Sequence, residues 1–168
     1  MSDSSLILIG MPGSGKSTVG KILADKWKYE FIDVDDFIED YTGKTVGEIL
    51  QKKGDDDFLK FESDVTQKIQ ISSKQIISTT GSNPLDLKAM KFLSQLGKIF
   101  WLDVSIDIIK NRLFKMKIDR IVGMKKKSLD YILLLRKKFY KQWADLRIKL
   151  ENETPEEIAE IIQKNFEL

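Results

Sequence analysis

The chain contains 168 residues, of which 42% are hydrophobic and 32% are charged, with three prolines, ten glycines and a net charge of +2. This composition predicts one globular domain spanning residues 1–168 and excludes disordered, collagen-like and solenoid chains. The absence of Cys and His excludes disulfides, thiolate nucleophiles, His general bases and His or Cys metal sites, so acid–base chemistry falls to Asp, Glu, Lys or Tyr.

Short apolar runs alternate with segments of helical period, which is the pattern of a parallel sheet with covering helices. Strands are predicted at residues 6–9, 31–33, 75–78, 98–102 and 146–150. Helices are predicted at residues 16–26, 34–41, 46–53, 55–71, 86–96, 105–115 and 128–144, and a last helix begins at Thr154-Pro155-Glu156-Glu157. Residues 116–127 are polar, basic and fit neither period, so we expect a mobile loop there. The fold class is therefore α/β, with a five-stranded parallel sheet flanked by helices.

A phosphate-binding motif follows the first strand. Residues 10–17 read Gly-Met-Pro-Gly-Ser-Gly-Lys-Ser and match G-x-x-x-x-G-K-[ST] between a strand and an amphipathic helix, as the motif requires. The loop backbone and the helix N-terminus would hold ATP or GTP phosphates, Lys16 would reach the β and γ phosphates, and Ser17 would ligate Mg2+. The predicted nucleotide-binding residues of this segment are Gly13, Ser14, Gly15, Lys16, Ser17 and Thr18.

Charge is unevenly distributed along the chain. Residues 30–64 hold 12 acidic and 4 basic residues, whereas residues 110–149 hold 14 basic and 3 acidic ones. The basic segment is either a solvated helical surface or a cover that attracts a polyanionic ligand toward the site.

Further motifs follow in a specific order. They are Phe31-Ile32-Asp33-Val34-Asp35, then Gly54-Asp55-Asp56-Asp57-Phe58 leading to Glu62, then Gly81, Arg120, and Arg136 with Tyr140 and Ala144. This succession resembles the shikimate kinases, small P-loop kinases of the nucleoside monophosphate kinase-like group. The resemblance implies a three-layer P-loop kinase fold, a substrate-binding helical region at about residues 34–62 and a lid at about residues 116–127.

The resemblance also implies roles for particular residues. Asp33 would hold Mg2+ through water, Asp35 would hydrogen-bond the acceptor hydroxyl and draw its proton, and Arg120 would close over the transferring phosphoryl group. Arg112 would pack on adenine. The implied catalytic residues are Lys16, Asp35 and Arg120, and the implied acceptor-binding residues are Asp35, Phe58, Glu62, Gly81 and Arg136. From the residues alone, Asp35 can also be interpreted as a helix N-cap. Asp103 ends an apolar strand as a Walker B carboxylate would, but the family usually has no metal role at that position, so a cap of the following helix is favoured for it.

Two positions depart from the pattern of the family. Leu59 stands where the family has a second arginine for the carboxylate of the acceptor, and Thr80-Gly81-Ser82 stands where a Gly triplet is usual. Shikimate is the favoured acceptor, and the product would be shikimate 3-phosphate, in aromatic amino-acid biosynthesis. A kinase for another small polyol or hydroxy acid, such as gluconate, is the alternative that Leu59 favours. A nucleotide-binding module without turnover is a third interpretation, which the retention of Lys16, Ser17, Asp33, Asp35 and Arg120 together opposes.

The remaining expectations concern location and partners. No apolar run exceeds four residues, far from the ~20 needed to span a bilayer, and the first residues lack the basic start of a signal peptide. We therefore expect a cytoplasmic monomer that binds ATP, Mg2+ and a small-molecule acceptor, without nucleic-acid or membrane partners.

Overall fold

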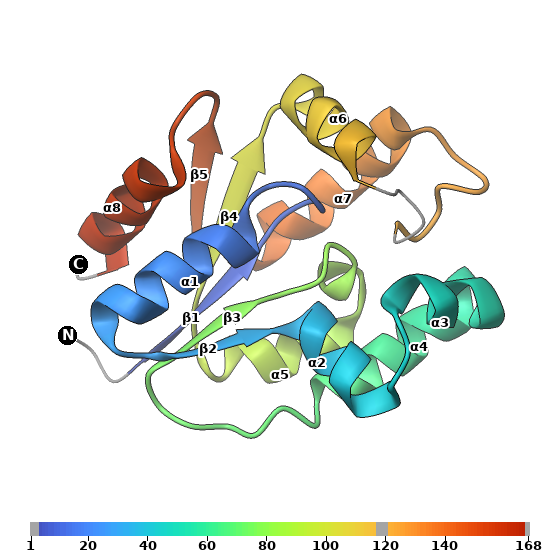
Figure 1. The fold of residues 1–168 in the computed structure, drawn as a ribbon, viewed down its shortest axis with the longest axis horizontal. Coiled ribbons are helices and arrows are strands. Elements are labelled where there is room, and N and C mark those ends of the chain that lie inside the picture. Colours follow the sequence, from blue (N-terminus) through green and yellow to red (C-terminus); the bar gives the residue numbers. More distant parts are fainter. Residues whose placement is uncertain (1–3, 117–120, 167–168) are drawn as a thin grey trace.

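The computed structural model describes residues 4–116 and 121–166. The strands are β1 (Ser5–Ile9), β2 (Glu30–Asp33), β3 (Gln75–Ser78), β4 (Gly97–Val104) and β5 (Leu146–Leu150) (Figure 1). The helices are α1 (Lys16–Trp27), α2 (Val34–Thr42), α3 (Val46–Lys53), α4 (Asp55–Thr66), the short 3-10 helix η1 (Asn83–Leu85), α5 (Leu87–Ser94), α6 (Ile106–Lys115), α7 (Leu129–Trp143) and α8 (Pro155–Phe166). None of the helices described here is long and apolar enough to cross a membrane.

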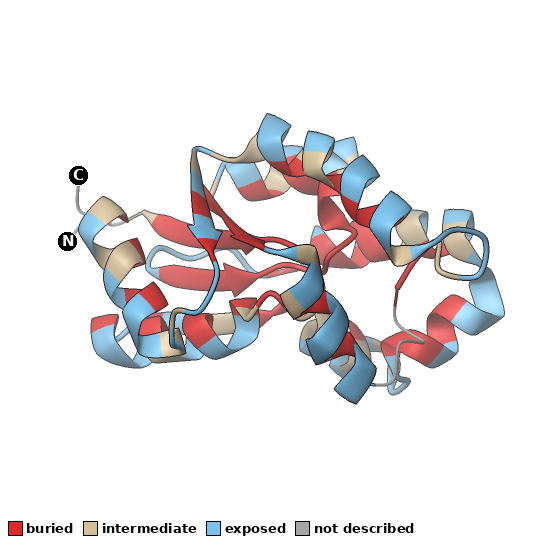
Figure 2. Cartoon of the chain, turned by 90° about the horizontal axis from the view of Figure 1, so that it is seen from above, coloured by how far each residue is buried: buried red, intermediate tan, exposed pale blue. Residues whose placement is uncertain are grey.

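The strands form one parallel sheet in the order β2-β3-β1-β4-β5. Helices lie on both sides of the buried strands, so the α/β class and the five-stranded parallel sheet are confirmed (Figure 2). The central strand β1 is buried along its whole length, because parallel strands covered on both faces are apolar throughout. Helix α1 packs against α8 and against β2 and β3, while α5 and α7 contact β4.

This topology gathers the functional loops at one edge. Since all strands run in the same direction, the residues that follow β1, β2 and β3 emerge at the carboxyl edge of the sheet, where ligands of open α/β sheets bind. Helices α2, α3 and α4 form a group beyond β2 and contact one another at the same edge (Figure 1).

Four predicted helices end early or begin late, of which α6 begins one residue late and α7 is one residue shorter at each end. The helix expected over residues 55–71 ends at Thr66, because the chain there turns with shorter bonds, from the Lys68 N–H to the Val65 carbonyl and from the Ile69 N–H to the Thr66 carbonyl. Ile69 is buried all the same, which explains why the apolar period continued past the helix. The helix expected over residues 86–96 begins at Leu87, with Asp86 as its N-cap.

Candidate active site

A cavity of about 560 Å3 opens at the carboxyl edge of the sheet. Its walls come from the phosphate loop, the start of α2, helix α4, the β3–η1 loop, helices α6 and α7, and the segment where α8 begins. The charged side chains among its lining residues are Lys16, Asp33, Asp35, Asp36, Glu62, Arg112, Lys115, Arg136 and Glu153. Residues that are far apart in the sequence therefore line the same cavity.

The phosphate loop has the backbone that its glycines predict. Gly10, Gly13 and Gly15 all have positive φ, and Gly15 is the N-cap of α1 at φ 95°. A Cβ on Gly10 would lie 2.8 Å from the Leu102 carbonyl oxygen, so a side chain there would collide with β4. Ser14 Oγ is buried without a hydrogen-bond partner among the described residues, which leaves a polar atom that a phosphate oxygen or a water could satisfy.

Lys16 lies inside the loop that it is predicted to serve. Its Nζ donates to the carbonyl oxygens of Gly10 at 2.9 Å and Met11 at 3.0 Å. Burial lowers the pKa of Lys16 to about 8, although the nearby carboxylates of Asp35 and Asp33 act in the opposite direction. An anion bound in the loop would favour the charged form of Lys16, so a bound phosphate group would raise the pKa of this side chain.

Ser17 and Asp33 meet beside the loop. Ser17 Oγ donates to Asp33 Oδ2 and lies 3.2 Å from Ser78 Oγ, while Asp33 Oδ1 accepts from the Asp35 N–H at 3.0 Å. Mg2+ prefers oxygen ligands and is held by one or two carboxylates together with substrate phosphates, so this pair of oxygen donors fits it. Within residues 4–116 and 121–166 no group of three or more Asp or Glu side chains that could hold a metal ion is present.

Asp35 follows in the first turn of α2 and lines the cavity. The N-cap of this helix is Asp33, so the reading of Asp35 as the N-cap is wrong. The Asp35 carboxylate acts electrostatically on both Lys16 and Glu62, and all three side chains line the same cavity.

The cavity also contains two buried ionisable side chains. Glu62 and Arg136 are only 1% and 2% exposed. Both oxygens of Glu62 accept from Ser82 Oγ at 2.9 Å, and burial raises the pKa of Glu62 to about 7. Arg136 Nη2 donates to the Val122 carbonyl at 3.1 Å. The sequence predicted Glu62 and Arg136 as site residues. It did not predict the hydrogen bonds between Glu62 and Ser82, which are 20 positions apart along the chain.

Gly81 and Tyr140 contact each other beside Arg136. A Cβ on Gly81 would lie 2.4 Å from Pro12 Cδ and 3.0 Å from an Arg136 nitrogen, so this position has no room for a side chain. Tyr140 Oη donates to the Gly81 carbonyl at 2.7 Å, and burial raises the pKa of Tyr140 to about 12. Tyr140 therefore holds the loop on which Gly81 lies, a contact that the motif spacing alone did not predict.

Helix α4 presents an apolar face near Glu62. Phe58 is buried and lines the cavity, whereas Leu59 is half-buried, packs against the hydrophobic core and is absent from the cavity lining. Lys60 lies 3.7 Å from the exposed carboxylate of Asp57, so its charge is directed away from Glu62.

Arg112 borders the phosphate loop. Its Nη1 donates to the Gly13 carbonyl at 2.9 Å, and the side chain is otherwise exposed. Glu153, Pro155 and Ile158 line the cavity as well, and they were not expected from the sequence. The sequence feature that could have indicated them is the position of this segment directly after a predicted parallel strand, where ligands of such sheets bind. Arg120 lies outside the described residues.

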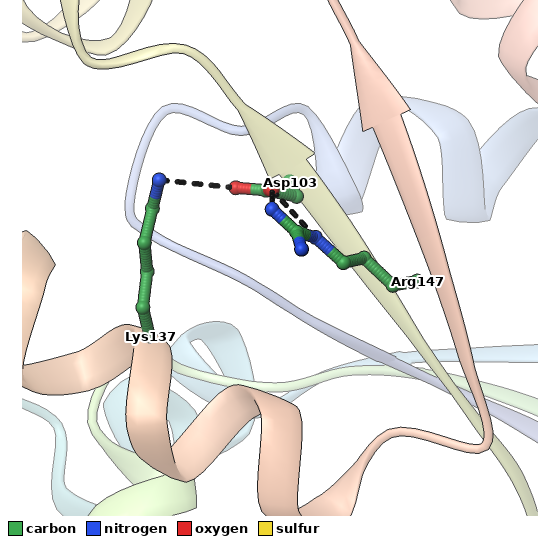
Figure 3. Close-up of polar contacts among 3 residues, drawn as sticks. All are labelled: Asp103, Lys137 and Arg147. Carbon is green, nitrogen blue, oxygen red and sulfur yellow. Dashed lines mark hydrogen bonds and ion pairs between the residues drawn. The ribbon is translucent and has the colours of Figure 1, made fainter.

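Asp103 has a different surrounding from the one its position suggests. It belongs to β4 and accepts from Arg147 Nε at 2.8 Å and from Arg147 Nη2, while Lys137 Nζ lies 3.8 Å from its other oxygen (Figure 3). The N-cap of α6 is Ser105. The expected capping role of Asp103 is therefore wrong. Strand β4 continues past Asp103, and the Asp103 side chain forms an ion pair with the Arg147 side chain on β5.

Known proteins share this architecture. The family model described as shikimate kinase matches residues 12–167. Threonine synthase-like 1 of Macaca fascicularis is 41% identical over 161 residues, which make up 94% of this chain and 22% of that protein. The shikimate kinase of Sulfurihydrogenibium sp. is 35% identical over 161 residues, covering 94% of this chain and 95% of that relative. The structure of Acinetobacter baumannii shikimate kinase in complex with shikimate has a TM-score of 0.87 at 27% identity, covering 96% of this chain and 92% of that one.

Proposed function

The chain belongs to the shikimate kinase family, and from that premise we propose that it transfers the γ-phosphoryl group of ATP to a hydroxyl of a small molecule, with shikimate as the acceptor. The observation that carries this proposal is the meeting of Lys16, the Ser17–Asp33 pair and Asp35 around the same cavity as Arg136. Phosphoryl transfer needs positioning and charge neutralisation more than covalent chemistry by the protein, and these residues supply both.

The nucleotide half of the cavity would bind MgATP. Gly13, Ser14, Gly15 and Thr18 border the phosphates, and Lys16 leaves its carbonyl partners to contact the β and γ phosphates. Ser17 and Asp33 would hold Mg2+, which when bound neutralises negative charge on the phosphate oxygens. Arg112, whose guanidinium already contacts the loop at Gly13, would flank the base.

The acceptor half would bind and orient the hydroxyl. Arg136 presents a planar cation to the carboxylate of shikimate, and Asp35 accepts the hydrogen bond of the reacting hydroxyl. The oxygen of that hydroxyl forms a bond to the γ-phosphorus while the bond from that phosphorus to the bridging oxygen of ADP breaks. The proton of the hydroxyl passes to the Asp35 carboxylate, and the product is shikimate 3-phosphate, an intermediate of aromatic amino-acid biosynthesis.

Residues 116–127 are proposed to close over the two substrates as a lid, with Arg120 contributing a cation. Within this segment the described part contacts the site, because the Val122 carbonyl accepts from Arg136 and the Gly123 N–H donates to Asp55 Oδ1 at 3.2 Å. These bonds connect the segment both to the acceptor end of the cavity and to the start of α4.

Leu59 favours a second candidate within the same reaction class. With an apolar residue on α4, the site offers Arg136 alone for a carboxylate, so a small polyol or hydroxy acid such as gluconate is the alternative acceptor. The chain spans 22% of the length of the Macaca fascicularis relative, whose name is not that of a shikimate kinase. A silent nucleotide-binding module is less well supported, because a decayed site would not keep the Ser17–Asp33 bond beside a buried lysine.

The proposal is tested by acceptor-dependent ADP release. Purified protein with MgATP is supplied with shikimate, gluconate and other hydroxylated acids in turn, and the products are identified by mass spectrometry. Phosphorylated shikimate supports the proposal in full, a different phosphorylated acid supports the second candidate, and tight ATP binding without any phosphorylated product supports the silent module.

A further inference from the structure

The acceptor end of the cavity contains a carboxyl group, Glu62, that forms no ion pair within residues 4–116 and 121–166. Glu62 is buried and lines the cavity. Its hydrogen-bond donors are neutral hydroxyls, that of Ser82, which contacts both carboxylate oxygens, and that of Thr80. Each oxygen therefore keeps acceptor capacity for a further donor.

Arg136 is the complementary basic side chain of the same cavity. It is buried and lines the same cavity, its Nη2 contacts a backbone carbonyl, and it makes no ion pair with a carboxylate within the described ranges. Arg136 and Glu62 influence one another electrostatically without contact. Burying a charge without an ion-pair partner is unfavourable, so a cavity that offers an acidic and a basic side chain is complementary to a ligand that carries both charges.

The described residues of the neighbouring elements place no cation in contact with Glu62. On α4, Leu59 is three residues before Glu62 and shares its face of the helix, but its side chain is apolar. Lys60 is paired with Asp57 at the surface. Lys16 donates to the Gly10 and Met11 carbonyls of the phosphate loop. Among the described residues Glu62 therefore has no cationic side chain in contact with it, and a cationic group on the ligand would be such a partner.

We propose that the acceptor site takes a hydroxylated amino acid, with its carboxylate on Arg136, its ammonium group on Glu62 and its hydroxyl on Asp35. This inference rests on the proposed phosphoryl transfer and names a further class of acceptor for it. An ammonium group offers three N–H donors and a full charge, so it satisfies both Glu62 oxygens beside the Ser82 hydroxyl. Shikimate and gluconate carry a carboxylate and hydroxyls but no cation, and they leave Glu62 without a charged partner.

The reaction on this acceptor is the same transfer. The hydroxyl oxygen of the amino acid forms the bond to the γ-phosphorus of ATP as the bond to the ADP oxygen breaks, and Asp35 receives the hydroxyl proton. The ammonium and carboxylate groups do not change, so Glu62 and Arg136 orient the acceptor and take no part in bond making.

Matched pairs of acceptors isolate the contribution of the ammonium group. Serine and glycerate differ in the replacement of an ammonium group by a hydroxyl, and homoserine and 2,4-dihydroxybutyrate differ in the same way. Binding of each compound is measured by titration calorimetry on the full chain saturated with MgADP. We expect at least one amino acid to bind at least tenfold more tightly than its hydroxy-acid partner. Equal or weaker binding of both amino acids overturns the inference.

Variants assign that preference to Glu62. Glu62→Gln removes the charge and keeps the shape, so the tenfold difference within a pair should disappear. Asp57→Asn makes the same chemical change on the exposed side of α4 and should keep the difference. If Glu62→Gln does not fold, as judged by loss of its thermal shift with MgADP, Ser82→Ala replaces it. That variant leaves Glu62 fully available, so the preference must persist or grow, and its loss contradicts the inference.

Turnover separates this inference from the proposed function. Phosphorylation of shikimate without any preference for ammonium in binding leaves the kinase assignment intact and overturns the amino-acid class. A preference for ammonium without phosphorylation of any acceptor supports the binding site and overturns the kinase assignment.

Discussion

Replacing Glu62 by Gln should change how the stability of the protein depends on pH. Burial raises the pKa of Glu62 from 4.5 to about 7, because the desolvated carboxylate has only hydroxyl donors around it. In the folded protein Glu62 keeps its proton over a pH range in which the unfolded chain has already released it. The free energy of unfolding of the wild type therefore falls as the pH rises from about 4.5 to about 7, and this contribution then stays constant.

The magnitude follows from the difference between the two pKa values. Each tenfold change in proton affinity corresponds to ~1.4 kcal/mol, so ionising Glu62 in place costs the folded state about 3 kcal/mol in total. Between pH 5 and pH 8 the wild type should lose about 2 to 3 kcal/mol that Glu62→Gln does not lose. Gln has no proton to release, and its fixed packing cost is the same at both pH values.

Urea unfolding of both proteins at pH 5 and pH 8 measures this effect. The quantity of interest is the stability of Glu62→Gln minus that of the wild type, since other carboxylates cancel in this difference. It should rise by about 2 to 3 kcal/mol from pH 5 to pH 8. Asp57→Asn, at an exposed carboxylate of the same helix, should show no such rise. The same difference at both pH values would refute the reasoning that Glu62 is a desolvated carboxylate.

Three further predictions concern the cavity. Leu59→Arg places a cation three residues before Glu62 on α4. The Michaelis constant for shikimate, measured by steady-state kinetics, should then fall roughly tenfold. The preference for ammonium acceptors, measured by calorimetry, should shrink. Lys16→Met should lower turnover at least a hundredfold in the ADP-release assay, because the phosphate charge loses its buried cation, while far-UV circular dichroism stays unchanged. Residues 121–127 should gain hydrogen-exchange protection when MgADP and an acceptor bind together, as expected of a lid.

Each of these has a contrary outcome. An unchanged Michaelis constant in Leu59→Arg would mean that this face of α4 does not reach the acceptor. Turnover of Lys16→Met close to the wild-type value would remove the phosphate loop from the reaction. Full protection of residues 121–127 before any ligand is added would contradict a closing lid.

The strands and the phosphate loop could be predicted from the sequence because their signals are local. The predicted strand at 75–78 coincides with β3 (Gln75–Ser78), and that at 146–150 with β5 (Leu146–Leu150), since short β-prone runs between turn residues fix both ends. Helix α4 was predicted five residues too long, because the buried Ile69 continues the apolar period through a turn. Periodicity reports which side chains are buried, and it does not report where the backbone changes from helix to turn.

In the site, too, contacts within local motifs could be predicted, whereas contacts between distant segments could not. The Ser17–Asp33 bond lies where the order of strand and loop predicts it. The contacts of Glu62 with Ser82 and of Tyr140 with Gly81 join segments 20 and 59 positions apart, and only the packing of α4 and α7 against the β3–η1 loop brings them together. Asp103 was misassigned for the same reason, since the pairing of β4 with β5 decides its partner.

The central claim is that this chain phosphorylates a small-molecule hydroxyl, and product analysis tests it most directly. The wild-type protein is incubated with MgATP and an acceptor panel that contains shikimate, gluconate, serine and homoserine, and phosphorus NMR follows the products. The account predicts one new phosphate ester, formed in equal amount with ADP and absent with Asp35→Asn. If the protein binds MgATP but forms no ester with any member of the panel at millimolar concentrations, the claim is contradicted.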